Sequence, residues 1–166
     1  MHDKLTESDI RKMEEEIEHR KLVVRPKALE DLKVARAQGD LSENFEYYAA
    51  KKAKNQNESR IRYLENMIKT ARVIDDSSAE DEVGMNNTVT VEYLDDHSTQ
   101  ELKIVTTVRA NSLGGYITPE SPVGKALIGH KVGDTVHVKV NDAVQYYLKI
   151  IALENTDDTG DEINSY

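Results

Sequence analysis

The chain of 166 residues carries 22 Lys and Arg against 31 Asp and Glu, a net charge of −9, and it contains no cysteine. The lack of cysteine excludes disulfides, thiolate metal ligands and cysteine nucleophiles, which suits a reducing cytoplasm. No apolar run approaches the roughly 20 residues that a membrane span needs, and residues 1–9 lack the apolar core of a signal peptide. We therefore expect a cytoplasmic protein without a membrane partner.

The negative charge is concentrated in the second half of the chain. Residues 1–74 contain 16 Lys and Arg against 14 Asp and Glu, whereas residues 75–166 contain 6 against 17. Ten of these acids fall in two short runs, 75–82 and 154–162, which are typical of a solvated linker and tail. A basic footprint over a whole domain is absent, although the first half can still meet phosphate locally.

Residues 1–74 show helical spacing in two long segments. The first is predicted to begin after Thr6, an N-cap with Asp9 three residues on. Pro26 predicts a kink near Val24 and Arg25, and Gly39 predicts the end of the segment. The expected inward stripe comprises Ile10, Met13, Ile17, Leu29, Leu32 and Ala35.

The second helical segment is predicted to begin near Ser42 or Glu43 and to continue to Ala71. Its expected inward positions are Ala49, Ala50 and Ala53 near the turn and Ile61, Leu64 and Ile68 near the base. Two antiparallel helices of about 30 residues would each reach about 45 Å. The pattern predicts a coiled-coil hairpin over residues 1–74.

The apolar period changes from helical to alternating after an acidic linker at residues 75–84. Strands are predicted at 88–93, 101–108, 116–117, 136–140 and 144–153. Ser121 and Pro122 predict the capped start of a short helix that ends at Gly129. The sequence therefore indicates an α+β protein in which a small antiparallel sheet with one short helix occupies residues 85–154. The polar tail at 155–166 is expected to be disordered.

The turn between the two predicted helices carries two carboxylates, Asp40 and Glu43, three residues apart. One interpretation is structural, because Asp40 or Ser42 can cap the second helix while Glu43 lies near its positive end. The other is a metal-binding tip, because Mg²⁺ prefers oxygen ligands and is commonly held by one or two carboxylates. Spacing alone leaves both interpretations open.

The stretch ARAQGDLSENFEYYAA, from Ala35 to Ala50, resembles the tip of the Gre transcript-cleavage factors of bacterial RNA polymerase, of the GreA type. Arg25-Pro26 matches the helix-interrupting pair of that family. The stretch SPVGKALIG from Ser121 to Gly129, followed by KVGD from Lys131, is similar to its C-terminal signature. Two motifs in the right order and at the right separation make the resemblance specific, and it extends over most of the chain.

The resemblance implies a hairpin that enters the secondary channel of RNA polymerase and a C-terminal domain with an FKBP-like fold. Asp40 and Glu43 would share a catalytic Mg²⁺ with the polymerase, so that the polymerase, and not this chain alone, hydrolyses the 3′ end of a backtracked RNA. Arg36 would pair with an RNA phosphate or position the acids. We expect a monomer with no stably bound cofactor of its own.

Two further expectations concern contacts with the polymerase. The resemblance points to docking through the C-terminal sheet and the region from Ser121 to Lys131, with Ser121, Pro122, Gly124 and Lys125 as the residues concerned. Phe45, the one phenylalanine of the chain, stands where the family usually has alanine. It either makes a new contact inside the channel or packs across the hairpin against Ala37 or Leu41.

Two other functions fit the same hairpin. The first is a polymerase modulator that plugs the channel without supporting cleavage. The second is a general coiled-coil scaffold or chaperone. Shortening of a backtracked RNA from its 3′ end would separate the cleavage factor from both.

Overall fold

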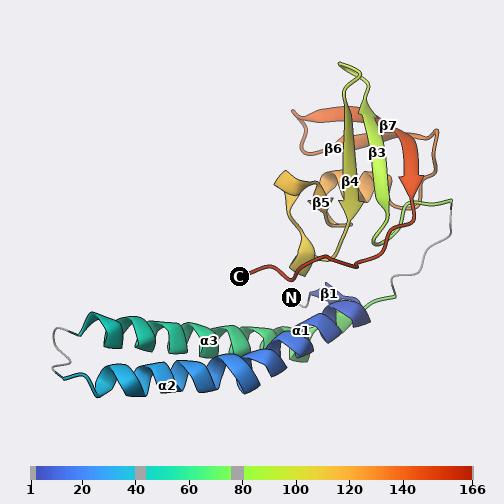
Figure 1. The fold of residues 1–166 in the computed structure, drawn as a ribbon. Helices are drawn as coiled ribbons and strands as arrows, with labels where there is room; N and C mark the ends of the chain where they lie inside the picture. The colour runs from blue at the N-terminus through green and yellow to red at the C-terminus, as the bar shows by residue number, and fades with distance from the viewer. Residues whose placement is uncertain (1–2, 40–43, 76–80, 166) are drawn as a thin grey trace. The chain divides into compact units, whose positions relative to one another are not determined.

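The computed structural model describes residues 3–39, 44–75 and 81–165. The chain forms two compact units, one over Asp9–Ala71 and one over Arg72–Tyr166 together with Lys4–Ser8. The first is a hairpin of helices and the second is built around a β-sheet, so the predicted α+β class is confirmed (Figure 1). None of the described helices is long and apolar enough to cross a membrane.

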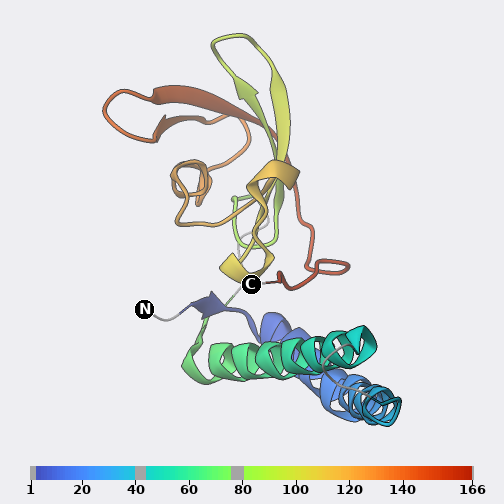
Figure 2. The same cartoon turned by 90° about the vertical axis from the view of Figure 1, so that its left-hand side faces the viewer.

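The hairpin consists of two antiparallel helical runs that lie side by side (Figures 1 and 2). The first run comprises α1 (Glu7–His19), a π-helical segment (Arg20–Val24) and α2 (Arg25–Arg36). The second run is the single helix α3 (Phe45–Thr70), whose 26 residues correspond to about 39 Å. The predicted helix start after Thr6 is confirmed, since α1 begins at the next residue.

The predicted interruption at Pro26 takes the form of a π-helical turn. Pro26 is the second residue of α2, and the backbone N–H of Arg25 donates to the carbonyl of Arg20, five residues earlier. Proline has no N–H, and its ring crowds the carbonyl four residues before it, so a wider turn accommodates it. The first helical run changes direction at this turn (Figure 1).

The π turn shifts the inward face of the helix by one residue. Ala28 and Ala35 are both buried and lie seven residues apart, the usual spacing of inward positions in a helical hairpin. Ala28 lies eight residues after Arg20, which contacts α3, so the π turn adds one residue to that spacing. The prediction that Leu29 faces inward was wrong: Leu29 is 47% exposed, and its neighbour Ala28 takes the inward position. In α3, Ile61 and Leu64 are buried as predicted, but Ala49 and Ala53 are exposed.

A layer of polar side chains joins the helices at the π turn. Arg20 donates to the Asn57 side chain (3.0 Å), and the Asn57 amide donates back to the Arg20 carbonyl (3.3 Å). Glu16 accepts from Arg20 (2.7 Å) and from two nitrogens of the buried Arg60 (2.8 and 3.2 Å). Burial of Glu16 opposes its charge, but the hydrogen bonds from Arg60 and Arg20 prevail and hold its pKa below the usual 4.5.

The β unit contains a five-stranded sheet in the order β5-β4-β3-β7-β6. Its elements are β3 (Thr88–Tyr93), β4 (Thr99–Ile104), β5 (Tyr116–Ile117), β6 (Thr135–Lys139), β7 (Gln145–Glu154) and the helix α4 (Pro122–Leu127). The pairs β3–β4, β3–β7 and β6–β7 are antiparallel, as expected, but β4–β5 is parallel. The second predicted strand ends at Ile104, and Thr107–Arg109 forms a 3₁₀ turn.

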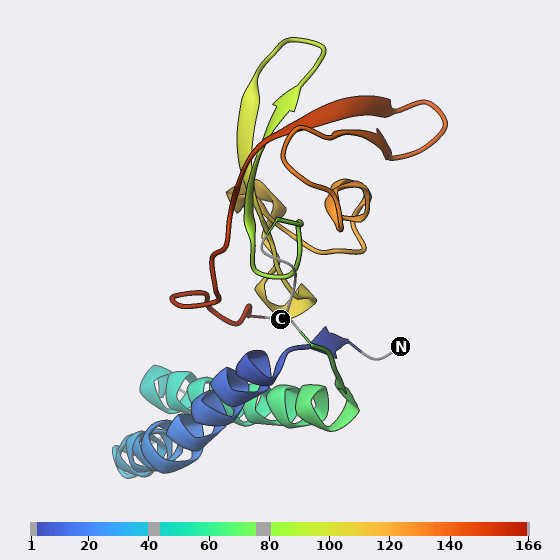
Figure 3. The ribbon, with the colours of Figure 1, turned by 90° about the vertical axis from the view of Figure 1, so that its right-hand side faces the viewer.

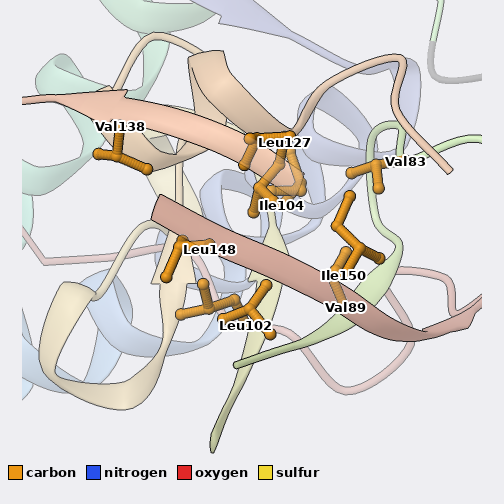
Figure 4. Packing of buried hydrophobic residues seen from close by; sticks show 10 residues of the cluster. Val83, Val89, Leu102, Ile104, Leu127, Val138, Leu148 and Ile150 are labelled. Atoms are coloured by element: carbon orange, nitrogen blue, oxygen red, sulfur yellow. The ribbon is translucent and has the colours of Figure 1, made fainter. Parts of the chain in front are cut away.

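The curled sheet wraps around one hydrophobic core, with α4 beneath the β6–β7 hairpin (Figure 3). The core side chains come from β3, β4, β6, β7 and α4, as Figure 4 shows for Val89, Ile104, Leu127, Val138 and Ile150, among others. Val83 also belongs to this core and is 2% exposed, so the β unit already begins within the stretch assigned to the linker. Burial of these alternating apolar residues is the main stabilisation of the unit.

The chain enters and leaves the hairpin through a two-stranded parallel ladder. β1 (Lys4–Leu5) pairs with β2 (Arg72–Val73), and the Ile74 amide donates to the Leu5 carbonyl (2.9 Å). Leu5 is fully buried. These strands cannot be predicted from the sequence, because two residues are too few to show an alternating pattern.

The expectation of a disordered tail was wrong for its described part. Residues 155–165, which we call the strap, leave β7 and run beside the 3₁₀ turn at Thr107–Arg109, where the Asn164 amide donates to the Val108 carbonyl (Figure 3). Within the strap, Asp161 accepts from Lys103 (3.0 Å) and Arg109 (2.9 Å), and all three residues are buried. The acidic composition that suggested disorder thus supplies a carboxylate that forms ion pairs with two buried cations.

Candidate functional site at the end of the hairpin

The end of the hairpin opposite the β1–β2 ladder carries the acidic turn. Asp40 and Glu43 lie outside the described residues, as do Leu41 and Ser42, and the structure describes the residues that flank the turn on both sides. On one side α2 ends at Arg36, and the Ala37 amide still donates to the Lys33 carbonyl (3.2 Å). Gly39 follows with φ +120°, a conformation that L side chains rarely adopt, which explains a glycine at this position.

On the other side of the turn Asn44 holds the two helices together. Its side-chain oxygen accepts from the Tyr47 amide (2.9 Å), which makes Asn44 the N-cap of α3. Its side-chain nitrogen donates to the Ala35 carbonyl in the last turn of α2 (2.6 Å). One amide therefore caps the second helix and ties it to the first.

The position of this cap tests the capping role that was considered for the turn. The interpretation in which Asp40 or Ser42 caps the second helix was wrong, because α3 begins at Phe45 and Asn44 fills the cap position. A helix has one N-cap residue, so the carboxylates that precede Asn44 are not required for capping. Glu46 is the acid within the first turn of α3.

Arg36 lies beside the first turn of α3. Its guanidinium carbon is 5.7 Å from the centroid of the Tyr47 ring, and the side chain is exposed. Such a cation–π contact stabilises by about 0.5–1 kcal/mol at an exposed site. The Arg36 charge is thus held next to the turn and remains accessible to an anion.

Phe45 does not pack across the hairpin. Its side chain is 85% exposed, and Ala37, one of the two residues it was expected to contact, is also exposed. The next turn carries Tyr48, which is 50% exposed and packs edge-on against Tyr47 with ring centroids 5.5 Å apart. The hairpin end therefore presents aromatic rings as well as charge.

Comparison with known proteins assigns both halves of the chain to one family. The model of the N-terminal domain of transcription elongation factors GreA and GreB matches residues 4–73, and the model of their C-terminal domain matches residues 78–155. The chain belongs to the GreA/GreB family. The resemblance seen in the tip and in the C-terminal motif is therefore confirmed.

Relatives named transcription elongation factor GreA match over most of their length. The protein of Macrococcus caseolyticus is 40% identical over 149 residues, covering 90% of this chain and 94% of the relative. The protein of Streptococcus gordonii is 40% identical over 153 residues, covering 92% and 95%. Among solved structures, Gfh1 of Thermus thermophilus is 25% identical and covers 93% of this chain and 100% of its own, with a TM-score of 0.43.

The C-terminal family motif forms α4 and its cap. Ser121 is the N-cap, since its hydroxyl accepts from the Gly124 amide (3.1 Å) and donates to the Thr118 carbonyl (2.7 Å). A Cβ on Gly124 would lie 2.0 Å from the Thr118 carbonyl oxygen, so no larger residue fits there. Ser121 and Gly124 thus have structural roles, whereas Pro122 and Lys125 are exposed and accessible to a partner.

Proposed function

We propose that this chain is a transcription elongation factor that binds bacterial RNA polymerase and stimulates the polymerase's own cleavage of backtracked RNA. In this proposal the hairpin enters the secondary channel, and the chain does not cleave RNA alone. The observation that carries the proposal is membership of the GreA/GreB family over both halves of the chain, with relatives named transcription elongation factor GreA at about 40% identity. The hairpin supports it, since α3 alone spans about 39 Å and can carry the turn deep into a channel.

Asp40 and Glu43 would hold the Mg²⁺ for cleavage jointly with the polymerase. Their carboxylates are the donors that Mg²⁺ prefers, and the capping role of Asn44 leaves them available. Two carboxylates do not complete the coordination of a Mg²⁺ ion, so this proposal requires further ligands from the polymerase, the RNA phosphates or water. When bound, the ion would activate the attacking water and stabilise the charge that develops on the phosphate.

The flanking residues would position the RNA. Arg36 is exposed and held over Tyr47 beside the turn, where it can donate to a phosphate oxygen. Asn44 ties the start of α3 to the end of α2, so the two helix ends that flank the turn are joined directly. The exposed Pro122 and Lys125 of α4 would contribute to docking on the polymerase surface.

The test is RNA cleavage in a purified, backtracked elongation complex with Mg²⁺. We expect the wild-type protein to shorten the RNA from its 3′ end. Asp40→Asn and Glu43→Gln should each abolish this stimulation while polymerase binding is retained, and Glu46→Gln, in the first turn of α3, is the matched control. Normal cleavage by both tip variants would refute the assigned chemistry. Slower synthesis without shortening, caused by the wild type, would instead support the channel plug.

A further inference from the structure

The first turns of α3 expose aromatic rings on the face that points away from the partner helix. Phe45 and Tyr48 are three residues apart and therefore lie on the same side of the helix. They are 85% and 50% exposed, respectively. The inward side of α3 is marked instead by Asn57 and Ile61, which are buried against the first helical run. Hairpin packing thus does not explain why Phe45 and Tyr48 are aromatic.

The Tyr48 ring is held in place by its contact with Tyr47, which in turn contacts Arg36. The Tyr48 ring packs edge-on against Tyr47, at an interplanar angle of 68°, and Tyr47 lies under the guanidinium of Arg36. A side chain fixed before its ligand arrives loses less conformational entropy on binding. Tyr48 is therefore preorganised, with half of its surface still accessible.

The charge around these rings favours a polyanion. Residues 33–55 carry five Lys and Arg against three Asp and Glu, although the whole chain has a net charge of −9. The exposed residues next to the rings include Glu46, Lys51 and Lys52 as well as Ala49, so charged side chains flank the rings on α3. Separate aromatic rings among cations are typical of surfaces that bind single-stranded nucleic acid, while the centre of a protein interface is depleted in charge.

We propose that Phe45 and Tyr48 form a stacking platform for an unpaired base of the backtracked RNA. The inference rests on the proposed function, which brings the hairpin end to that RNA and names the ligand class. Stacking needs only the flat face of a base, so the platform would accept any of the four bases. It would hold the displaced nucleotide beside the turn while Arg36 contacts its phosphate.

The experiment uses a backtracked polymerase complex with 2-aminopurine at the displaced 3′ end of the RNA. Ca²⁺ replaces Mg²⁺, so that base stacking is measured without cleavage. We expect the full-length wild-type protein to quench the 2-aminopurine fluorescence. The double variant Phe45→Leu with Tyr48→Leu keeps apolar volume but removes both rings. It should lose the quenching and bind the backtracked complex about 5- to 150-fold more weakly, as expected for the loss of base stacking.

Two controls separate stacking from other contacts. Tyr48→Phe keeps the ring and should behave as wild type, and a complex that is not backtracked should bind the double Leu variant as tightly as wild type. The far-UV circular dichroism of the variants should be unchanged, since both side chains are exposed. If the double Leu variant matches wild type while the double Ala variant binds weakly, the contact is with an apolar protein surface and the proposal is overturned.

The fluorescence experiment and the cleavage assay test the two proposals independently. Quenching by a wild-type protein that fails to stimulate cleavage in Mg²⁺ would support the platform and refute the cleavage function. Cleavage without quenching would support the cleavage function and overturn the platform. Absence of quenching by the wild type overturns the stacking proposal in every case.

Discussion

Replacing Asp161 by Asn should destabilise the β unit strongly, although the residue lies in an acidic tail. The Asp161 carboxylate accepts from Arg109, whose side chain is fully buried, and from Lys103, whose side chain is 11% exposed. Removing one partner of a buried ion pair costs about 3–5 kcal/mol, because the remaining charge is left uncompensated. Asn keeps one acceptor oxygen, so we expect about 3 kcal/mol. In a unit of roughly 100 residues this corresponds to a fall in Tm of about 12–24 °C.

Thermal and urea unfolding would measure this effect, with near-ultraviolet circular dichroism of the tyrosines as the signal, since five of the eight belong to the β unit. Glu162→Gln is the matched control, since it removes an adjacent acid that is exposed, and it should change the free energy of unfolding by less than about 0.5 kcal/mol. Equal stability of Asp161→Asn and Glu162→Gln would refute the reasoning. It would mean that the Asp161 carboxylate of the strap does not compensate the buried charges of Lys103 and Arg109.

Three further predictions concern the cap, the α4 turn and the polar layer of the hairpin. Asn44→Ala should cost about 1 kcal/mol and speed hydrogen exchange at the Tyr47 amide, which would lose its acceptor; unchanged exchange would contradict the capping role. Gly124→Ala should cost at least about 1–3 kcal/mol in urea unfolding, because its Cβ meets the Thr118 carbonyl, whereas Lys125→Ala should have little effect. Because the pKa of Glu16 is lowered in the folded state, its contribution to stability is present above pH 4.5 and is lost as the pH falls through the folded pKa. Glu16→Gln should flatten this part of the stability–pH curve of the helical unit, and an unaltered slope would exclude the effect.

The larger features of the fold could be predicted because they depend on local patterns. The change of period after residue 84 separates the helical hairpin from the sheet, and Ser121-Pro122 marks the start of α4 with its cap. The details that failed depend on contacts distant in sequence. Leu29 is more apolar than Ala28, but packing against α3 selects Ala28, seven residues before the buried Ala35, as the inward position.

The candidate site could likewise be predicted from the sequence only in part. The family motif at the tip indicates Asp40, Glu43 and Arg36, and Phe45 is a departure from that motif. The cap was predicted two to four residues too early, at Ser42 or Asp40, because Asp, Ser and Asn are all good N-caps, and only the backbone geometry selects Asn44. The strap was missed because a polar, acidic composition resembles disorder unless the buried cations that face it, Lys103 and Arg109, are known.

The π turn at Arg20–Val24 has a consequence for how hairpins of this kind can change in length. The turn holds one residue more than an α-helical turn, and Ala28 therefore stays in the seam with α3 although it lies eight residues after Arg20. Inserting one further residue beside the exposed Leu22 or Val23 would rotate the distal half of the helix by about 100° and turn Ala28 and Ala35 away from α3. Substitution at Leu22 or Val23 should be tolerated where such an insertion is not, so the number of residues in this turn, more than their identity, sets the direction in which the helix presents Arg36.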